Sequence, residues 1–82
     1  MIFRVKLFGP QARLAGCREL AVELPGSPST CLMLRDALAR THQELAASMP
    51  SSRLAVNHQY ARDDDPIQPD DEIALIGLIS GG

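Results

Sequence analysis

The side chains that most often carry chemistry are present in this 82-residue chain, but they do not form a recognisable catalytic pattern. Cys17 and Cys31 make no C-x-x-C pair, and neither they nor His42 and His58 stand at metal-ligand spacing. No G-x-S-x-G segment marks an activated serine, and the glycines do not follow a phosphate-binding spacing. We therefore expect no general acid, general base, metal site or bound cofactor in this chain, and no self-contained enzyme.

Six of the ten carboxylates lie in the segment 63–72, which also contains two prolines. This segment lacks the alternating ligands and the final glutamate of a calcium-binding loop. We interpret it as a solvated loop. A metal site and a docking surface for a basic partner are the alternatives.

The ending of the chain is chemically more distinctive, because Ser80, Gly81 and Gly82 directly follow the apolar segment 73–79. Glycine has no Cβ, so such an ending can approach a reacting centre closely and adopt backbone angles that other residues avoid. Residues 79–82 would reach about 13 Å beyond a sheet when extended. The simplest interpretation is a frayed chain end. The alternative is a terminus that the fold presents to a partner, and the elements that precede it decide between the two.

The first elements expected are two half-buried strands, because hydrophobic residues alternate with polar ones in 2–8 and 19–24. The connection between them, 9–18, carries glycines near both ends, and we interpret it as a long loop. Ser29 or Thr30 then offers a helix cap.

Apolar residues at helical spacing predict a helix from about residue 31 to the mid-forties, ended by Met49 and Pro50. A short strand, a turn at 57–59 and a strand stub follow. The segment 72–79 is apolar on both faces, which favours a position in the middle of a sheet.

The predicted order is β-β-α-β-β, with one main helix covering one face of a mixed sheet. It predicts a single α+β domain, residues 1–82, with a β-grasp (ubiquitin-like) fold and a flexible tail at 79–82. The fold alone says nothing about chemistry.

Composition excludes several other classes of protein. The net charge is −2, Lys6 is the single lysine and the arginines are scattered, so we expect no nucleic-acid partner. The longest apolar run, 73–79, is far shorter than the ~20 residues that span a bilayer, and we expect no membrane partner. Two unpaired cysteines and an N-terminus without a signal-peptide core predict a cytoplasmic protein.

Several segments resemble the ubiquitin-like sulfur-carrier family, often called the MoaD/ThiS family, which includes the small subunit of molybdopterin synthase. The opening "VKLFGPQARLAG" resembles the first strand and loop of that family, and "LRDAL" resembles its helix. The C-terminal half carries the matching Val56-Asn57, Pro66, Asp70-Asp71-Glu72, 73–79 and Gly81-Gly82.

This resemblance implies a sulfur carrier in molybdenum cofactor biosynthesis. A separate adenylating enzyme, using ATP and magnesium, would activate the carboxylate of Gly82, and a sulfur donor would then convert it to a thiocarboxylate. Ser80 and Gly81 would thread into the large, catalytic synthase subunit, in an assembly of two small and two large subunits. The carrier itself would not be an enzyme and would bind no cofactor.

Strand parity places Phe8 and Ile76 on the outward face of the sheet, and Tyr60 follows the turn as a third exposed apolar residue. The resemblance places the contact with the large subunit there. We therefore predict that these three residues form the partner interface. The alternative is that Phe8 and Ile76 merely cap the sheet edge.

The sequence departs from the molybdopterin branch at Gly77 and Leu78, where that branch commonly carries two prolines. Prolines would stiffen the exit of the tail, whereas glycine loosens it. A carrier for thiamine thiazole or cysteine biosynthesis is therefore an alternative. Two further alternatives are a non-catalytic β-grasp binding module with an inert Gly-Gly and a protein modifier joined to lysines.

Overall fold

The computed structural model describes residues 1–25 and 28–77 of the chain. Seven short strands and four helical segments follow one another within these ranges. In chain order they are β1 (Ile2–Leu7), α1 (Gly9–Ala15), β2 (Glu19–Glu23), β3 (Ser29–Thr30), α2 (Cys31–Thr41), α3 (Gln43–Ala46), the 3₁₀ turn η1 (Met49–Ser51), β4 (Ser52–Val56), β5 (Gln59–Tyr60), β6 (Pro66–Ile67) and β7 (Ile73–Gly77).

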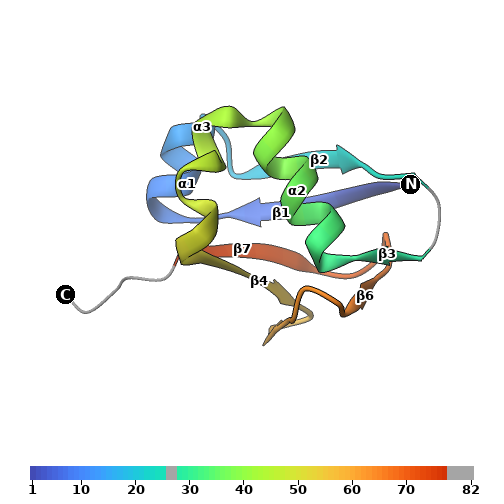
Figure 1. Cartoon of the computed structure of the whole chain (residues 1–82). Coiled ribbons are helices and arrows are strands. Elements are labelled where there is room, and N and C mark those ends of the chain that lie inside the picture. The colour runs from blue at the N-terminus through green and yellow to red at the C-terminus, as the bar shows by residue number, and fades with distance from the viewer. Residues whose placement is uncertain (26–27, 78–82) are drawn as a thin grey trace.

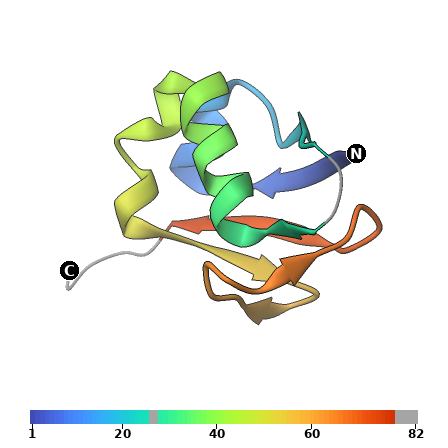
Figure 2. The same cartoon turned by 45° about the vertical axis from the view of Figure 1, so that its right-hand side comes forward.

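Five of the strands form one mixed sheet in the order β2-β1-β7-β4-β5. The central strands β1 and β7 run parallel, with Val5 opposite Ile73, while the other pairs are antiparallel. Figures 1 and 2 show α2 packed across one face of this sheet, with α1 and α3 at the end where β1 finishes. The predicted α+β fold, with its mixed sheet and main helix, is confirmed.

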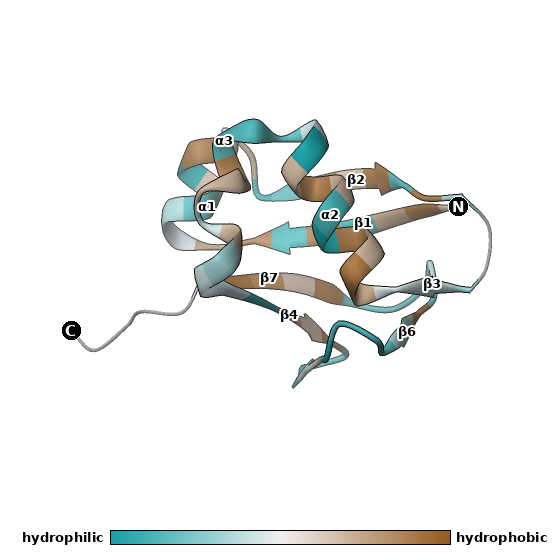
Figure 3. Ribbon diagram, viewed as in Figure 1, coloured by the Kyte–Doolittle hydropathy of each residue, from teal (hydrophilic) through white to brown (hydrophobic). Residues whose placement is uncertain are grey.

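The hydrophobic core lies between α2 and the sheet. The burial of β1 and β2 alternates with period two, as the sequence predicts. In β7 the residues Ile73 and Leu75 are fully buried beneath the helices. Figure 3 shows hydrophobic residues concentrated along β7 and alternating with hydrophilic ones along β1. The predicted central position of the last strand is therefore confirmed.

Helix α2 begins at a cap formed by Thr30, whose Oγ1 accepts a hydrogen bond of 3.4 Å from the backbone N–H of Met33. Ser29, the other candidate, is instead buried in β3. The predicted continuous helix to the mid-forties is wrong in one respect, because the helix breaks at His42. Just before the break, Thr41 Oγ1 donates a hydrogen bond of 2.7 Å to the carbonyl of Ala37, a local bond that often bends helices.

The connection interpreted as a long loop contains the short helix α1, so that prediction was also wrong. Pro10 occupies its first turn, where its missing N–H costs nothing. Gly16 ends the helix in the left-handed conformation, with φ of 74°, and its N–H bonds the carbonyl of Ala12 at 2.9 Å. The glycines that indicated a loop are the boundaries of a helix.

The predicted turn at 57–59 is a two-residue hairpin loop between β4 and β5. Asn57 and His58 have φ of 53° and 69°, as a type I′ turn requires at both central positions. The Asn57 side chain also bridges to the start of β7. Its Oδ1 accepts from the N–H of Glu72 at 3.0 Å, and its Nδ2 donates to Asp71 at 3.1 Å.

Acidic side chains stabilise the loop 63–72 from within. Asp65 accepts a hydrogen bond from the N–H of Arg62, and Asp71 accepts one from the N–H of Gln68, both at 2.8 Å. Asp63 pairs with Arg35 of α2 at 2.8 Å. These contacts favour the interpretation as a solvated structural loop.

We expect Asn57→Ala to lower the free energy of unfolding by about 2 kcal/mol, because it loses both side-chain bonds and strains a left-handed residue. Asn57→Gly loses the bonds without the strain and should cost about half as much. Urea denaturation followed by circular dichroism measures both values. Equal losses in the two variants would contradict the role of backbone strain.

Candidate functional site

The described residues offer no side-chain constellation that could perform covalent or metal chemistry. No group of three or more metal-ligating side chains occurs among residues 1–25 and 28–77. His42 lies 3.9 Å from Glu44, and the exposed His58 lies 3.2 Å from Glu72, on different parts of the surface. Burial raises the pKa of the Cys31 thiol to about 11, so that the thiol is protonated and unreactive near neutral pH.

A hollow of about 410 Å³ opens on the face of the sheet opposite to α2. Its wall is made by outward-facing residues of β1, β4, β5 and β7 and by residues next to the ends of these strands. It is lined by Lys6, Phe8, Ala55, His58, Tyr60, Glu72, Ala74 and Ile76. The structure thus brings together all three residues that the sequence analysis assigned to a partner interface.

We call Phe8, Tyr60 and Ile76 the sheet patch. Phe8 and Tyr60 are each 55% exposed, which is high for large apolar side chains, whereas Ile76 is half-buried between its neighbours. Such an exposed apolar centre is typical of a protein-binding surface. The prediction of exposure is confirmed for Phe8 and Tyr60.

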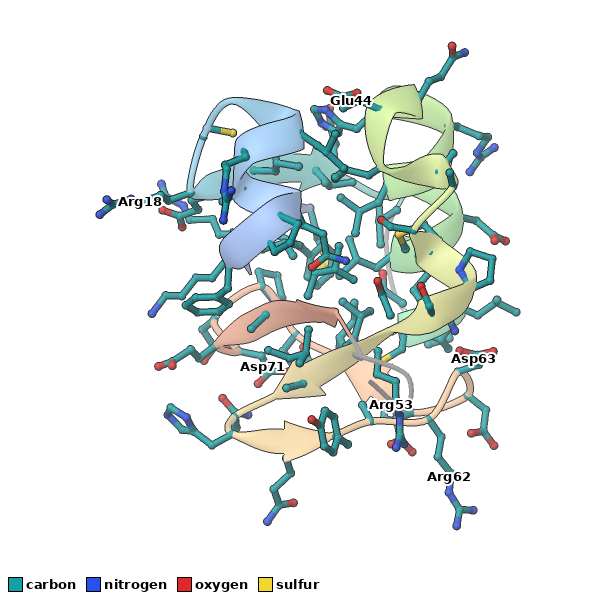
Figure 4. All side chains as sticks on the ribbon, turned by 90° about the vertical axis from the view of Figure 1, so that its left-hand side faces the viewer. Arg18, Glu44, Arg53, Arg62, Asp63 and Asp71 are labelled. Atoms are coloured by element: carbon teal, nitrogen blue, oxygen red, sulfur yellow. The ribbon has the colours of Figure 1, made fainter. Side chains whose placement is uncertain are left out.

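Charged side chains surround the sheet patch. Lys6 Nζ and His58 Nε2 lie 3.7 and 3.2 Å from the same carboxylate oxygen of Glu72. The guanidinium of Arg53 stacks 4.7 Å above the ring of Tyr60 and lies opposite Ile76 in the sheet. Figure 4 shows Arg53 on the sheet side of the molecule and Glu44 on the helix side. An apolar centre with a charged rim is the usual anatomy of an interface.

A second hollow, of about 320 Å³, lies where the described part of β7 ends. It shares Phe8 and Ile76 with the first hollow, so the sheet patch extends to Gly77. We call Gly77, the last described residue of β7, the root of the tail. Gly77, at that root, is exposed and pairs with Ser52 of β4. Ser80, Gly81 and Gly82, to which the sequence analysis assigned the chemistry, lie outside the described residues, as does the whole predicted tail 79–82.

The root of the tail also involves Gln11, which the sequence analysis did not identify. This α1 side chain is 4% exposed, and its Nε2 donates a hydrogen bond to Ser52 Oγ. A methyl group added at Gly77 would lie only 3.2 Å from its Oε1. The segment around Gln11 was interpreted as a loop, so nothing in the sequence indicated that this polar side chain is buried.

The fold and the site together define a β-grasp protein of the ubiquitin-like class, in which the central strand leads directly into the C-terminal tail. A profile of the ThiS family matches residues 5–82. The chain therefore belongs to the ThiS family, and the resemblance found in the sequence is confirmed.

Individual proteins agree with this assignment. The "molybdopterin synthase sulfur carrier subunit" of Dictyostelium discoideum is 34% identical over 82 residues, which are 98% of this chain and 95% of the relative. The crystal structure of SAMP1 from Haloferax volcanii superposes with a TM-score of 0.83 at 26% identity, covering all of both chains.

A third comparison concerns the fold alone. A chain from the complex of subunits 1 and 2 of the molybdopterin-converting factor of Helicobacter pylori has a TM-score of 0.69 and 20% identity over the full length of both chains. In the part of this chain that the structure describes, no helix is long and apolar enough to cross a membrane.

Proposed function

We propose that this chain is a sulfur carrier for molybdopterin synthesis and acts through its own C-terminus. The observation that carries the proposal is the 34% identity, over nearly the whole length of both chains, with a relative named for that role. The ending Gly81-Gly82 directly behind the apolar last strand agrees with it. The same relative favours molybdopterin synthesis over the thiamine and cysteine pathways as the destination of the sulfur.

The proposed chemistry takes place at the carboxylate of Gly82. The α-carboxyl group of a peptide ordinarily has a pKa of about 3.5 and is therefore ionised at neutral pH, which makes it a poor electrophile. An adenylating enzyme would join this carboxylate to the AMP part of ATP–magnesium and release pyrophosphate. A sulfur donor would then displace AMP and leave a C-terminal thiocarboxylate.

The terminal glycines suit this chemistry because a backbone without side chains can enter a narrow channel. Ser80 and Gly81 would thread into the partner, and the partner would supply every acid and base. Cys31 agrees with this division of labour, since its buried thiol stays protonated near neutral pH and is a poor nucleophile. The chain alone would therefore not be an enzyme, and ATP and magnesium would belong to the activating enzyme.

The proposed principal partner is the large subunit of molybdopterin synthase, in an assembly of two small and two large subunits. The relative from Dictyostelium discoideum is named as a subunit, which supports a partner of this kind. The sheet patch provides a surface that continues to the root of the tail. A contact there would hold the carrier while its tail enters the partner. A cytoplasmic location is part of the same proposal.

Incubation with an adenylating enzyme, ATP, magnesium and a sulfur donor should convert Gly82 to the thiocarboxylate. Intact mass spectrometry should show a gain equal to the replacement of one oxygen by one sulfur, and fragmentation should place it on Gly82. Omission of ATP is the control and should abolish the gain. A gain located on Cys17 or Cys31 would contradict the proposed chemistry.

Phe8→Ala should weaken binding to the large subunit about 30-fold, the effect of losing an aromatic residue at the centre of an interface. Ile76→Asp should weaken it at least as much, because it places a charge in the apolar centre. Leu32→Ala is the matched control, since Leu32 is also an exposed hydrophobic residue but lies on α2. Calorimetric titration measures the affinities, and circular dichroism verifies the fold. Unchanged affinity in both sheet-patch variants would exclude this interface.

A protein modifier is a second candidate, favoured by the similarity to SAMP1 from Haloferax volcanii, whose full name is small archaeal modifier protein 1. Both functions would use an activated Gly82, and they differ in the acceptor. Isopeptide-linked conjugates that survive reducing conditions in cells would support the modifier. A binding module with an inert tail would give neither conjugates nor a sulfur-containing terminus.

A further inference from the structure

We propose that Gln11 is a positioning residue that clamps the root of the tail and sets the direction in which the chain leaves the sheet. The inference concerns Gly77, the last described residue of β7, and the side chains packed around it. The clamp is independent of the chain's function. Its consequence for activation rests on the proposed carrier function.

The first observation is the close approach of Gln11 to Gly77. A Cβ built on Gly77 would meet Oε1, Cδ and Nε2 of Gln11 at 3.2, 3.4 and 3.5 Å. The shortest of these distances is tighter than ordinary van der Waals contact, so the amide group lies directly against the glycine backbone. A side chain at position 77 would therefore require Gln11 to shift by a few tenths of an ångström.

The second observation is a chain of polar contacts that fixes Gln11 itself. Its Nε2 donates to Ser52 Oγ, and Ser52 Oγ donates to the carbonyl of Ser48 at 2.7 Å. Gln11 and Ser52 are 4% and 3% exposed, so water competes little for these bonds. Ser52 is also the residue paired with Gly77 across the sheet.

These contacts join three parts of the molecule at one point. Gln11 comes from α1, Ser52 begins β4, and Ser48 immediately precedes η1. A buried polar side chain costs free energy unless it is hydrogen-bonded, so the network holds one arrangement and disfavours others. The β7 backbone at Gly77 is therefore confined on the α1 side by the amide and on the β4 side by Ser52.

The clamp restrains the backbone at Gly77, the last described residue of β7. Glycine alone would increase the conformational freedom of the exit. The Gln11 amide removes part of that freedom because it packs within 3.2 Å of the position that a Cβ of residue 77 would take. The restraint at Gly77 is thus supplied by a side chain of the neighbouring helix α1.

A fixed exit direction matters for an enzyme that must receive the terminus in a narrow channel. If the root samples several directions, only a fraction of the molecules is ready to enter, and the apparent affinity falls by that fraction. Once the terminus is bound, the chemical step is unchanged. Loss of the clamp should therefore raise the KM for the carrier and leave kcat unaltered.

The test compares Gln11→Ala and Gln11→Met with the unmodified chain. The alanine variant removes both the packing and the hydrogen bond, whereas methionine retains the length of the side chain and removes the polar amide group. Amide hydrogen exchange at Gly77, measured by NMR, should accelerate about fivefold in the alanine variant, the effect of one ordinary buried hydrogen bond. The exchange rate of the methionine variant should lie between those of the unmodified chain and the alanine variant. Unchanged exchange in both variants would overturn the clamp.

The functional arm measures adenylation of the same variants by the activating enzyme. Gln11→Ala should raise the KM for the carrier about fivefold, with kcat within about twofold of the original value. Ile67→Val is the matched control, because it removes a buried methylene group from β6, in the other sheet, and should leave KM unchanged. A fall in kcat at constant KM would contradict a positioning role.

Gly77→Ala provides a test of the contact itself. In the original chain it should raise the KM for the carrier, because the new methyl group crowds Gln11. Combined with Gln11→Ala, which makes room for the methyl group, it should raise KM less. Additive effects would overturn the proposed contact. If the original chain is not adenylated at all, the carrier proposal fails, and the exchange measurement still decides whether the clamp exists.

Discussion

The parallel pairing of β1 with β7 is the constraint on which the rest of the structure depends. It places the first and last strands side by side, with Val5 opposite Ile73 and Leu7 opposite Leu75. Two parallel strands cannot be joined by a tight turn, so the chain between them must cross over the sheet, and α2 occupies that crossover. The inward side chains of both strands then lie beneath the helix and form the centre of the core. Because β4 pairs with the other edge of β7, Ile73–Leu75 are paired on both sides, and β4 alone continues the pairing to Gly77.

The division of the molecule into two sides follows from this arrangement. One face of the sheet is covered by helices and stabilises the fold, whereas the opposite face carries the sheet patch and its charged rim. The patch continues to Gly77, so the surface that would bind a partner and the segment that would enter it are adjacent. The proposed function leaves the chemistry to the terminus and to other proteins. The root of the tail is the place where the two sides meet, since Gln11 reaches it from α1 while Ile76 faces the patch.

The sequence was informative where a local pattern decides the structure and uninformative where distant segments decide it. Alternation in β1 and β2, the cap at Thr30 and the doubly apolar β7 are local signals, and each was confirmed. The two-residue strands β3 and β6 are too short to show alternation, and their pairing joins residues far apart in the chain. Helix α1 was missed because its terminal glycines also indicate loops. Gln11 was missed for a related reason, since its burial depends on contacts with β4 and β7 that no local pattern encodes.

The central claim is that the reactive group of this protein is its own C-terminus, presented by a rigid domain that performs no chemistry itself. The most direct measurement compares the full chain with a chain lacking Gly82 in a reconstituted synthesis of molybdopterin, containing the large subunit, the adenylating enzyme and a sulfur donor. The account predicts that the full chain supports product formation, whereas the shortened chain binds the large subunit through the sheet patch and yields no product. Product formation by the shortened chain, at a rate comparable with that of the full chain, would contradict it.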